Sequence, residues 1–290
     1  MHTLFINGTA QNCENWDFIY KKYIQELYEK GTLFYGRNGE TRSAFGCSVT
    51  VDLRVGFPLT GLRKMPFRNL IREFLFDVGK DTNVAALGKA KHFWDFLADE
   101  NGELGASAYN RQWRQWPPSA GGSEVPNERL LTIGPLDQLE KVRQLLLDSP
   151  NSRHGTVITT NPTAIDPACP PCHLAMQFMP SGNFLDLMVP ARSNDMVVGF
   201  PLDIARYAII LTCMAKLTGF TPRFVYMPST NSHIYANCYD AVVEMVARRC
   251  SPICRLLVED RGQATWDDFV LEDFGISNYD PHPSIKLSVN

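Results

Sequence analysis

The sequence predicts a single domain of mixed α-helices and β-strands over residues 1–290. Apolar residues recur at three- and four-residue steps in segments 15–30, 67–78 and 135–148, which is typical of amphipathic helices. Runs of alternating or β-branched residues predict strands at 45–53, 156–160, 174–179 and 184–189. The 290-residue chain is 44% hydrophobic and 20% charged and contains no long apolar run, so we expect one soluble, folded unit.

The overall charge argues against nucleic acid as a partner. The net charge is -3, whereas proteins that bind polyanions usually carry a strong basic excess or a basic face. Any anionic ligand should therefore be small and held by local contacts. The chain has 8 cysteines scattered along it, and the residues after Met1 do not form an export signal, so we expect reduced thiols in a cytoplasm. Cys250 and Cys254 lack a matching second half nearby, so no metal site is expected.

The first predicted helix stops at Gly31 and is followed by a polar loop at 36–43. Arg37 and Arg42 lie in this loop, before the first predicted strand. Two interpretations stay open, because a basic loop at this place either binds an anion or is simply solvated.

Glu73 is the informative residue of the predicted helix 67–78, because it stands beside an apolar face. Its carboxylate either lies at the margin in water or points into a site. In a site, burial would raise its pKa and make it an acid or a base. Farther on, 93–97 resembles a helix end that leads into a turn at 98–102.

The segment 166–178 is the place where we expect chemistry. It presents a thiol and an imidazole, Cys172 and His173, just after Pro170 and Pro171 and just before an apolar strand. Each proline fixes its own φ and biases the preceding residue towards extended geometry, so the turn should be stiff. A cysteine held in this way becomes a nucleophile when positive charge or a neighbouring base favours its thiolate.

Three other interpretations of this segment were weighed. Cys169-x-x-Cys172-His173 matches the attachment pattern of c-type haem, but no export signal accompanies it. A redox Cys-x-x-Cys usually opens a helix, whereas a strand follows here. Two ordinary cysteines in a turn are the third possibility.

The segments after this turn predict a hairpin and then a long helix. The hairpin strands at 174–179 and 184–189 lead to a charged corner at 191–195. A mostly apolar helix then runs from Pro201 to Gly219, with proline near its start and glycine at its end. Asp203 lies in its first turn, where an acid is often only a capping residue or a favourable charge for the helix dipole.

At this point the sequence resembles the thymidylate synthase family, whose members alkylate carbon 5 of a pyrimidine nucleotide with folate. The resemblance covers roughly residues 30 to 290, and its motifs occur in the family's order. These motifs are Asp81-Thr82-Asn83, Trp94-Asp95, 98–102, Gln112-Trp113-Arg114, Asp137-Gln138, Ser152-Arg153, Pro171-Cys172-His173, Gln177-Phe178, Arg192-Ser193-x-Asp195, Gly199-x-Pro201, His233-Ile234-Tyr235 and 279–283. The resemblance implies a mixed α+β fold around twisted sheets with flanking helices, paired as a homodimer through a sheet face.

The resemblance also implies the catalytic residues. Cys172 matches the nucleophile that adds to carbon 6 of the base, and His173 would stand beside the base. Glu73 matches the carboxylate that organises waters and proton transfers. Tyr109 lies near the family's active-site tyrosine, although the segment 105–109 is one residue longer here.

Several residues match the positions that hold the nucleotide phosphate. Arg37, Arg192 and Ser193 are such positions on the same subunit, and planar guanidinium groups and a hydroxyl suit that task. In the family two successive arginines reach the same phosphate from the neighbouring subunit. Here this pair reads Arg153-His154, and histidine is a weaker, pH-dependent anion ligand.

The remaining matches concern the sugar and the folate. His233 and Tyr235 match the pair that binds the sugar 3'-hydroxyl. Asp195 matches the aspartate that bonds the folate pterin, Trp94 matches an aromatic wall of the folate pocket, and Gly199 belongs to a motif of the same region. The one-carbon donor implied is 5,10-methylenetetrahydrofolate, with no metal.

Asp203 departs from the family, since thymidylate synthases carry asparagine there. An amide can accept from the ring N–H of uracil and donate to its carbonyl. A carboxylate instead accepts from the amino group of cytosine and favours a protonated ring. The same aspartate in a comparable Arg-Ser-Asn-Asp context occurs in phage deoxycytidylate hydroxymethylases. We therefore expect dCMP as substrate, although a protonated aspartate could imitate asparagine and admit dUMP.

Three reactions and one non-enzymatic role follow from the resemblance. Water attack on the transferred methylene gives 5-hydroxymethyl-dCMP, which we favour because Leu97 stands where an aromatic residue is common and the chain ends in polar Asn290. The alternative is hydride transfer to give 5-methyl-dCMP, and dUMP methylation comes third. An idle family member that binds nucleotide or RNA as a regulator is the contrasting possibility. A phage protein of DNA modification, located in the host cytoplasm, is inferred from Asp203 alone.

Overall fold

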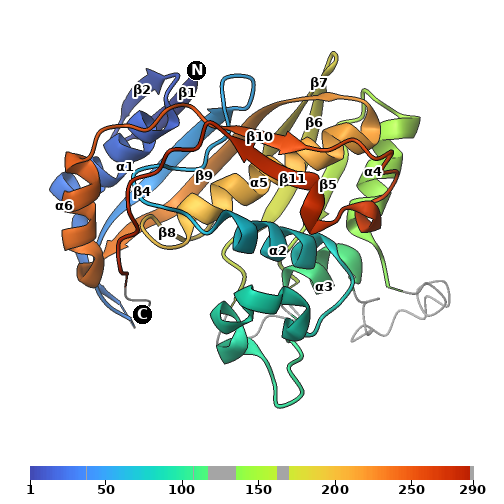
Figure 1. Ribbon diagram of the computed structural model, residues 1–290, viewed down its shortest axis with the longest axis horizontal. Helices are drawn as coiled ribbons and strands as arrows, with labels where there is room; N and C mark the ends of the chain where they lie inside the picture. The colour runs from blue at the N-terminus through green and yellow to red at the C-terminus, as the bar shows by residue number, and fades with distance from the viewer. Residues whose placement is uncertain (37, 107, 117–134, 162–169, 288–290) are drawn as a thin grey trace, which may run out of the picture.

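The computed structural model describes residues 1–36, 38–106, 108–116, 135–161 and 170–287, and a large mixed sheet forms its centre (Figure 1). Its strands are β1 His2–Ile6, β2 Thr9–Cys13, β3 Thr32–Gly36, β4 Gly39–Asp52, β5 Gly155–Ile158, β6 Ala175–Ser181, β7 Phe184–Met188, β8 Asn194–Asp195 and β9 Thr221–Tyr235. The order is β2-β1-β4-β9-β7-β6-β5, with β3 beside β4 and β8 beside β9. The pairs β7–β9 and β8–β9 are parallel, and the other pairs are antiparallel.

Helices flank this sheet, which confirms the predicted α+β class. They are α1 Trp16–Lys30, α2 Phe67–Val78, α3 Tyr109–Arg114, α4 Gln138–Asp148, α5 Phe200–Thr218 and α6 Tyr239–Ala247. Short 3₁₀ helices occur at η1 Val84–Phe93, η2 Asp95–Leu97, η3 Ala236–Cys238, η4 Trp266–Asp268 and η5 Leu271–Asp273, and β10 Arg255–Val258 pairs with β11 Phe274–Ser277 in a separate sheet. None of the helices within the described residues is long and apolar enough to cross a membrane.

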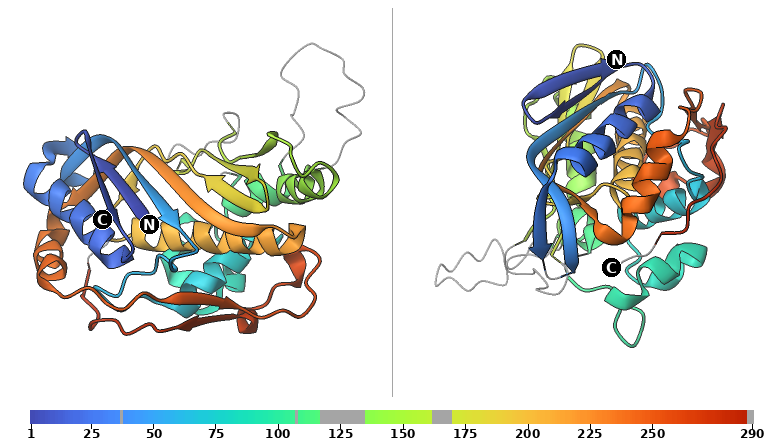
Figure 2. Two further views of the ribbon diagram at one scale, coloured as in Figure 1. Left: turned by 90° about the horizontal axis from the view of Figure 1, so that it is seen from above. Right: turned by 90° about the vertical axis from the view of Figure 1, so that its left-hand side faces the viewer.

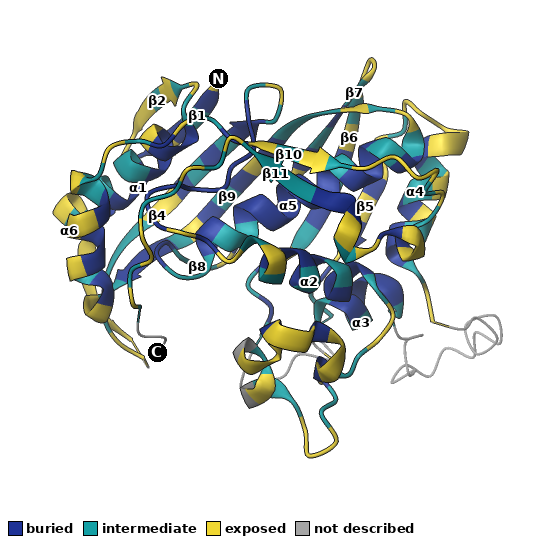
Figure 3. Cartoon of the chain, viewed as in Figure 1, coloured by how far each residue is buried: buried dark blue, intermediate teal, exposed yellow. Residues whose placement is uncertain are grey.

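Helices α1 and α5 pack on one face of the large sheet and create the core (Figure 2). Helix α5 is buried nearly all round, because the sheet covers one side and α2 and α4 contact others (Figure 3). Its length is set as its sequence predicts: Pro201 occupies the first turn, and Gly219 ends the helix with φ 77 while its N–H bonds the carbonyl of Ala215. This buried helix carries Asp203 on its first turn towards α2.

The helix and strand predictions are confirmed with shifts at two places. The predicted loop at 36–43 is wrong in part, because β3 and β4 form a hairpin there and β4 already begins at Gly39. Pairing with both β3 and β9 satisfies the backbone of these polar residues, so their side chains do not keep them out of the sheet. Helix α4 starts at Gln138 and not at 135, since Asp137 caps it by accepting the N–H of Glu140.

Candidate active site

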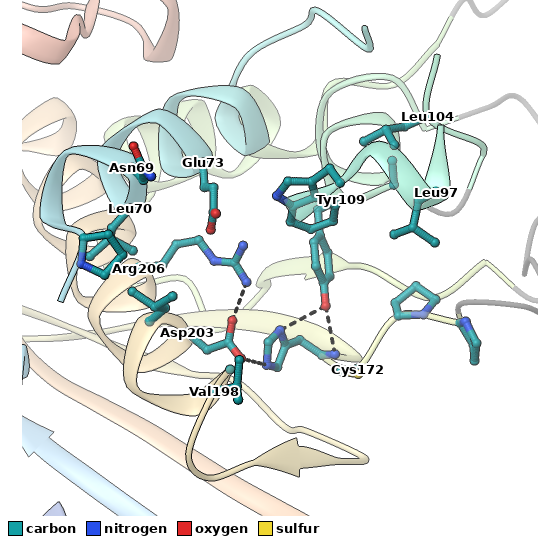
Figure 4. A pocket seen from close by; sticks show the side chains of 18 of the residues that line it. Asn69, Leu70, Glu73, Leu97, Leu104, Tyr109, Cys172, Val198, Asp203 and Arg206 are labelled. Atoms are coloured by element: carbon teal, nitrogen blue, oxygen red, sulfur yellow. Dashed lines mark hydrogen bonds and ion pairs between the residues drawn. The ribbon is translucent and has the colours of Figure 1, made fainter. Parts of the chain in front are cut away.

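A cavity of about 360 Å³ opens between α2, α5 and the turn that carries Cys172 (Figure 4). Its size suits a ligand of nucleotide or cofactor dimensions. Most of its wall is apolar, and its polar groups converge from α2, α3, α5 and the turn. The lining residues are Pro66, Asn69, Leu70, Glu73, Trp94, Leu97, Leu104, Gly105, Ala108, Tyr109, Pro170, Pro171, Cys172, His173, Val198, Gly199, Leu202, Asp203 and Arg206.

Arg192 holds the turn of Cys172 in place. Its guanidinium donates from Nε to the carbonyl of Pro171 at 2.8 Å and from Nη2 to the carbonyl of Pro170 at 2.6 Å. The backbone N–H of Arg192 donates to the carbonyl of Cys172 at 2.9 Å. Nη2 also lies 3.6 Å from Sγ of Cys172. A positive charge against the sulfur stabilises a thiolate, so this turn can present a nucleophile.

The imidazole of His173 is fixed by Tyr109 from α3. The phenol oxygen accepts the backbone N–H of His173 at 3.4 Å and lies 3.0 Å from Nδ1. Burial raises the pKa of Tyr109 well above its usual range, so its hydroxyl is protonated and donates to Nδ1. Burial also lowers the pKa of His173 to about 4, against the opposing effect of Asp203. We therefore assign a neutral ring with its proton on Nε2.

Nε2 of His173 faces Asp203 across the cavity floor. The distance from Nε2 to Oδ2 of Asp203 is 3.6 Å, and within the described residues Nε2 has no hydrogen-bond partner (Figure 4). Nε2 itself is buried, and the buried amide of Asn194 is a further polar group that acts on the ring. The cavity floor thus presents the acceptor Oδ2 of Asp203, with the ring of His173 packed beside it.

The carboxylate of Asp203 accepts a hydrogen bond from Arg206 and does not cap the N-terminus of α5. Nη2 of Arg206 donates to Oδ1 of Asp203 at 2.7 Å, and the N-terminus of α5 has no side-chain cap. The interpretation of Asp203 as a capping residue is therefore wrong, because the helix turns its side chain into the cavity beside Arg206. Nη1 of Arg206 donates to Oδ2 of Asp77 on α2 at 2.8 Å.

Glu73 points from α2 towards the guanidinium of Arg206 (Figure 4). Burial raises the pKa of Glu73 to about 7, with Arg206 opposing the rise and Asp77 and Asp203 adding to it. Of the two positions left open for this carboxylate, the structure shows the buried one, in the wall of the cavity. Near neutral pH it can both accept and donate a proton.

The residues expected to bind the sugar lie outside the cavity lining, at the end of β9. His233 pairs in register with Asp195 of β8, and its Nδ1 lies 3.0 Å from Oδ1 of Asn231. Its ring meets that of Tyr235 edge-on at 5.0 Å. Burial lowers the pKa of His233, which favours a neutral ring that can donate or accept. Ser193 lies next to Arg192, just before β8.

Of the residues expected to hold folate, Trp94 and Gly199 line the cavity and Asp195 does not. Oδ1 of Asp195 accepts the backbone N–H groups of Val197 at 2.9 Å and Val198 at 3.1 Å, which shapes the turn leading to Gly199. An apolar wall with a tryptophan and a few polar groups suits a flat, partly polar ring. The residues present therefore fit a bound folate.

None of the predicted phosphate ligands among the described residues lines the cavity, Arg192 and Ser193 included. Arg153 and His154 are exposed just before β5 and do not line the cavity. Their prediction concerns a neighbouring subunit and stays a prediction. Arg37 lies outside the described residues, as does Cys169.

Arg206 and Asp77 are the site residues that the sequence analysis missed. A signal was available: Arg206 follows Asp203 by three positions on an apolar helix, and Asp77 follows Glu73 by four, which places each pair on one helix face. What the sequence alone does not reveal is that these faces of α2 and α5 meet.

Comparison with known families yields a match over most of the chain. The family model described as thymidylate synthase matches residues 18–290, a span that includes every residue lining the cavity. No group of three or more His, Cys, Asp and Glu residues that could hold a metal occurs in the described part of the chain.

Proposed function

The chain belongs to the thymidylate synthase family, and from this premise we propose that it transfers a one-carbon unit to carbon 5 of dCMP and releases 5-hydroxymethyl-dCMP. Folate-dependent one-carbon transfer to a pyrimidine nucleotide is the reaction of the family, so the chain is a one-carbon transferase with methylenetetrahydrofolate as donor. The base and the product are the proposed parts.

The proposal of cytosine as the base rests on one observation, the carboxylate of Asp203 on the cavity floor. Cytosine offers an amino donor next to a ring nitrogen that accepts unless it is protonated, and an ionised carboxylate can accept from both the amino group and a protonated ring nitrogen. Uracil would direct a carbonyl oxygen at the same carboxylate. Such a mismatch leaves buried polar groups unpaired and discriminates strongly.

Cys172 is the proposed nucleophile. Its thiolate, beside the guanidinium of Arg192, would add to carbon 6 of the base, and a C–S bond would form while the electron pair of the 5,6 double bond makes carbon 5 nucleophilic. The carboxylate of Asp203 would hold the base meanwhile, with the neutral ring of His173 beside it. When the sulfur leaves later with its electron pair, the double bond is restored.

Glu73 is the proposed proton carrier. With its pKa near 7, it can take the proton lost from carbon 5 and can activate a water in the cavity. Bound methylenetetrahydrofolate supplies the one-carbon unit, and Trp94, Gly199 and Asp195 are the residues proposed to hold it.

Nucleotide binding is proposed for the residues that match the family's phosphate and sugar positions. Arg37, Arg192 and Ser193 would bind the phosphate, and His233 and Tyr235 would bind the sugar hydroxyl. Arg153 and His154 of a second subunit would complete the phosphate site. A homodimer fits the sheet: in β6, β7 and β9 one face is buried under helices, and the other exposes Met179, Met188 and Tyr226.

Whether water reaches the transferred methylene decides between the hydroxymethyl and the methyl product. A hydroxymethyl group arises when water adds to the methylene carbon and a proton leaves, so that carbon 5 exchanges its hydrogen for CH₂OH. The apolar wall with Leu70, Leu97 and Leu104 favours the second candidate, a methyl product from hydride transfer in a dry site. We favour the hydroxymethyl product because Leu97, at a position where the family resemblance leads us to expect an aromatic ring, would make the wall smaller there and leave space for a water.

The test is a mass spectrum of the nucleotides after incubation with methylenetetrahydrofolate and equal amounts of dCMP and dUMP. We expect dCMP to gain CH₂O. A gain of CH₂ on dCMP would support dCMP as the substrate but show that the product is 5-methyl-dCMP. Modification of dUMP alone would contradict the proposal. Cys172→Ser provides the control without turnover.

A further inference from the structure

We propose that Arg206, oriented by Asp77, is a specificity-determining positioning residue: it occupies Oδ1 of Asp203, leaves Oδ2 as the acceptor that a base meets, and thereby excludes uracil. This inference rests on the proposed function, since it concerns the choice between dCMP and dUMP.

The guanidinium of Arg206 divides its donors between two carboxylates. Nη2 donates to Asp203 at 2.7 Å and Nη1 donates to Asp77 at 2.8 Å. The side chains of Arg206 and Asp77 are each 4% exposed, so water screens this pair little. The ring centroids of Tyr109 and Tyr207 lie 5.4 Å and 5.8 Å from the guanidinium carbon, which limits its movement.

Several carboxyl groups, including that of Asp203, surround the guanidinium of Arg206. Three carboxyl groups, those of Glu73, Asp77 and Asp203, face this one guanidinium, and burial raises the pKa of Glu73 to about 7 and of Asp77 to about 6. The other titratable neighbours, His173 and Tyr109, are neutral near pH 7 and bring no positive charge. Arg206 therefore supplies a positive charge that these clustered carboxyl groups share.

A proton on Asp203 would change what the cavity floor accepts. A protonated carboxyl offers one O–H donor and one carbonyl acceptor, the same pair that an amide offers, and it would therefore pair with uracil. With Nη2 of Arg206 donating to Oδ1 at 2.7 Å, the permanent positive charge of the guanidinium favours Asp203 as an acceptor.

The position of Asp77 separates the proposed positioning role of the Arg206 pair from direct contact with the base. It is absent from the cavity lining, so it does not touch the base, and its hydrogen bond goes to Arg206. Its carboxylate accepts a hydrogen bond from Nη1 of Arg206, which leaves Nη2 directed at Oδ1 of Asp203. The other carboxylate oxygen, Oδ2, is left facing His173 and the cavity.

The experiment removes both charges of the pair without leaving either unpaired. Asp77→Asn/Arg206→Gln keeps hydrogen-bonding groups between α2 and α5, and Asp77→Leu/Arg206→Met replaces the pair by apolar groups should the first variant fail to fold. Arg206→Lys keeps the charge. The matched control is Asp186→Asn/Arg223→Gln, because Arg223 and Asp186 form a two-bonded pair on the sheet, away from the cavity lining.

Two ratios are measured for each folded protein: kcat/KM for dCMP over dUMP, and the affinity for dCMP over dUMP without folate. Loss of the buried charge should lower both ratios at least about tenfold, chiefly through better use of dUMP. Arg206→Lys and the control pair should keep the wild-type preference.

The outcomes separate this inference from the proposed function. A wild-type protein that prefers dCMP, with unchanged ratios in the uncharged variants, would overturn the role of Arg206 alone. Ratios for Arg206→Lys as low as those of the uncharged variants would also overturn it, because charge would not be the cause. A wild-type preference for dUMP would contradict the proposed function, and this inference with it.

Discussion

Glu73 shows how the surroundings of one side chain set its chemistry. Burial raises its pKa from about 4.5, the ordinary value, to about 7, so the folded protein holds a proton that the unfolded chain releases. The free energy of unfolding should therefore fall as pH rises from 4.5 through 7. Glu73→Gln lacks this fall, so its stability relative to wild type should increase by about 3 kcal/mol between pH 5 and pH 8.

Urea unfolding of wild type and Glu73→Gln at several pH values measures this difference. Glu272→Gln is a suitable control, because it changes a carboxylate outside the cavity lining. A stability difference for Glu73→Gln that does not vary with pH would show that the carboxylate is not held protonated.

Arg192 gives a second prediction at the residue scale. Because its guanidinium lies 3.6 Å from Sγ of Cys172, Arg192→Met should slow alkylation of Cys172 by iodoacetamide about tenfold at pH 7. The rate is read from the mass of the peptide that contains Cys172, with partly exposed Cys13 as internal reference. Arg192→Lys should retain most of the rate, and equal rates in all three proteins would contradict the assigned role of the charge.

The residues that carry chemistry could be predicted from sequence to different degrees. Cys172 and Glu73 stand out because each breaks its local pattern, one after two prolines and the other beside an apolar helix face. The role of Arg206 could not be predicted, because a charge on a mostly apolar helix gains its meaning only when α2 brings Asp77 within 2.8 Å.

At the scale of elements, α5 is the support for Asp203. Gly219 ends this helix at φ 77, and a Cβ there would meet nothing within 4 Å. Gly219→Ala should therefore destabilise the protein by roughly 1–2 kcal/mol through backbone strain alone. A thermal melt measures this, with Gly105→Ala as control, because Gly105 has neither a positive φ nor a neighbour within 4 Å. Equal melting temperatures for both variants would contradict the argument.

Helices with a clear period were predicted well, and the central strand was not. The bounds of α2 agree with the prediction, since apolar residues fill one helix face between Phe67 and Val78. The strand β9 was not predicted, because its polar residues 228–233 do not resemble a buried strand. It pairs with β4 on one side and with β7 and β8 on the other, and this tertiary pairing outweighs its sequence pattern.

At the scale of the whole molecule, the exposed sheet face and the position of Arg153 point to a shared site. We predict that a mixture of Cys172→Ser and Arg153→Ala/His154→Ala, dissociated and reassociated, gains activity that neither variant has alone. A mixed dimer would contain one site with an intact thiol and an intact partner arginine. Turnover of the mixture equal to the sum of its parents, with a monomer in sedimentation, would contradict the dimer.

If the carboxylate at position 203 selects cytosine, replacing it by an amide in Asp203→Asn should reverse the preference for the base. In competition between dCMP and dUMP, the wild-type protein should favour dCMP and Asp203→Asn should favour dUMP, with the ratio of kcat/KM shifted at least about a hundredfold. A preference that is the same in both proteins would contradict this role of Asp203.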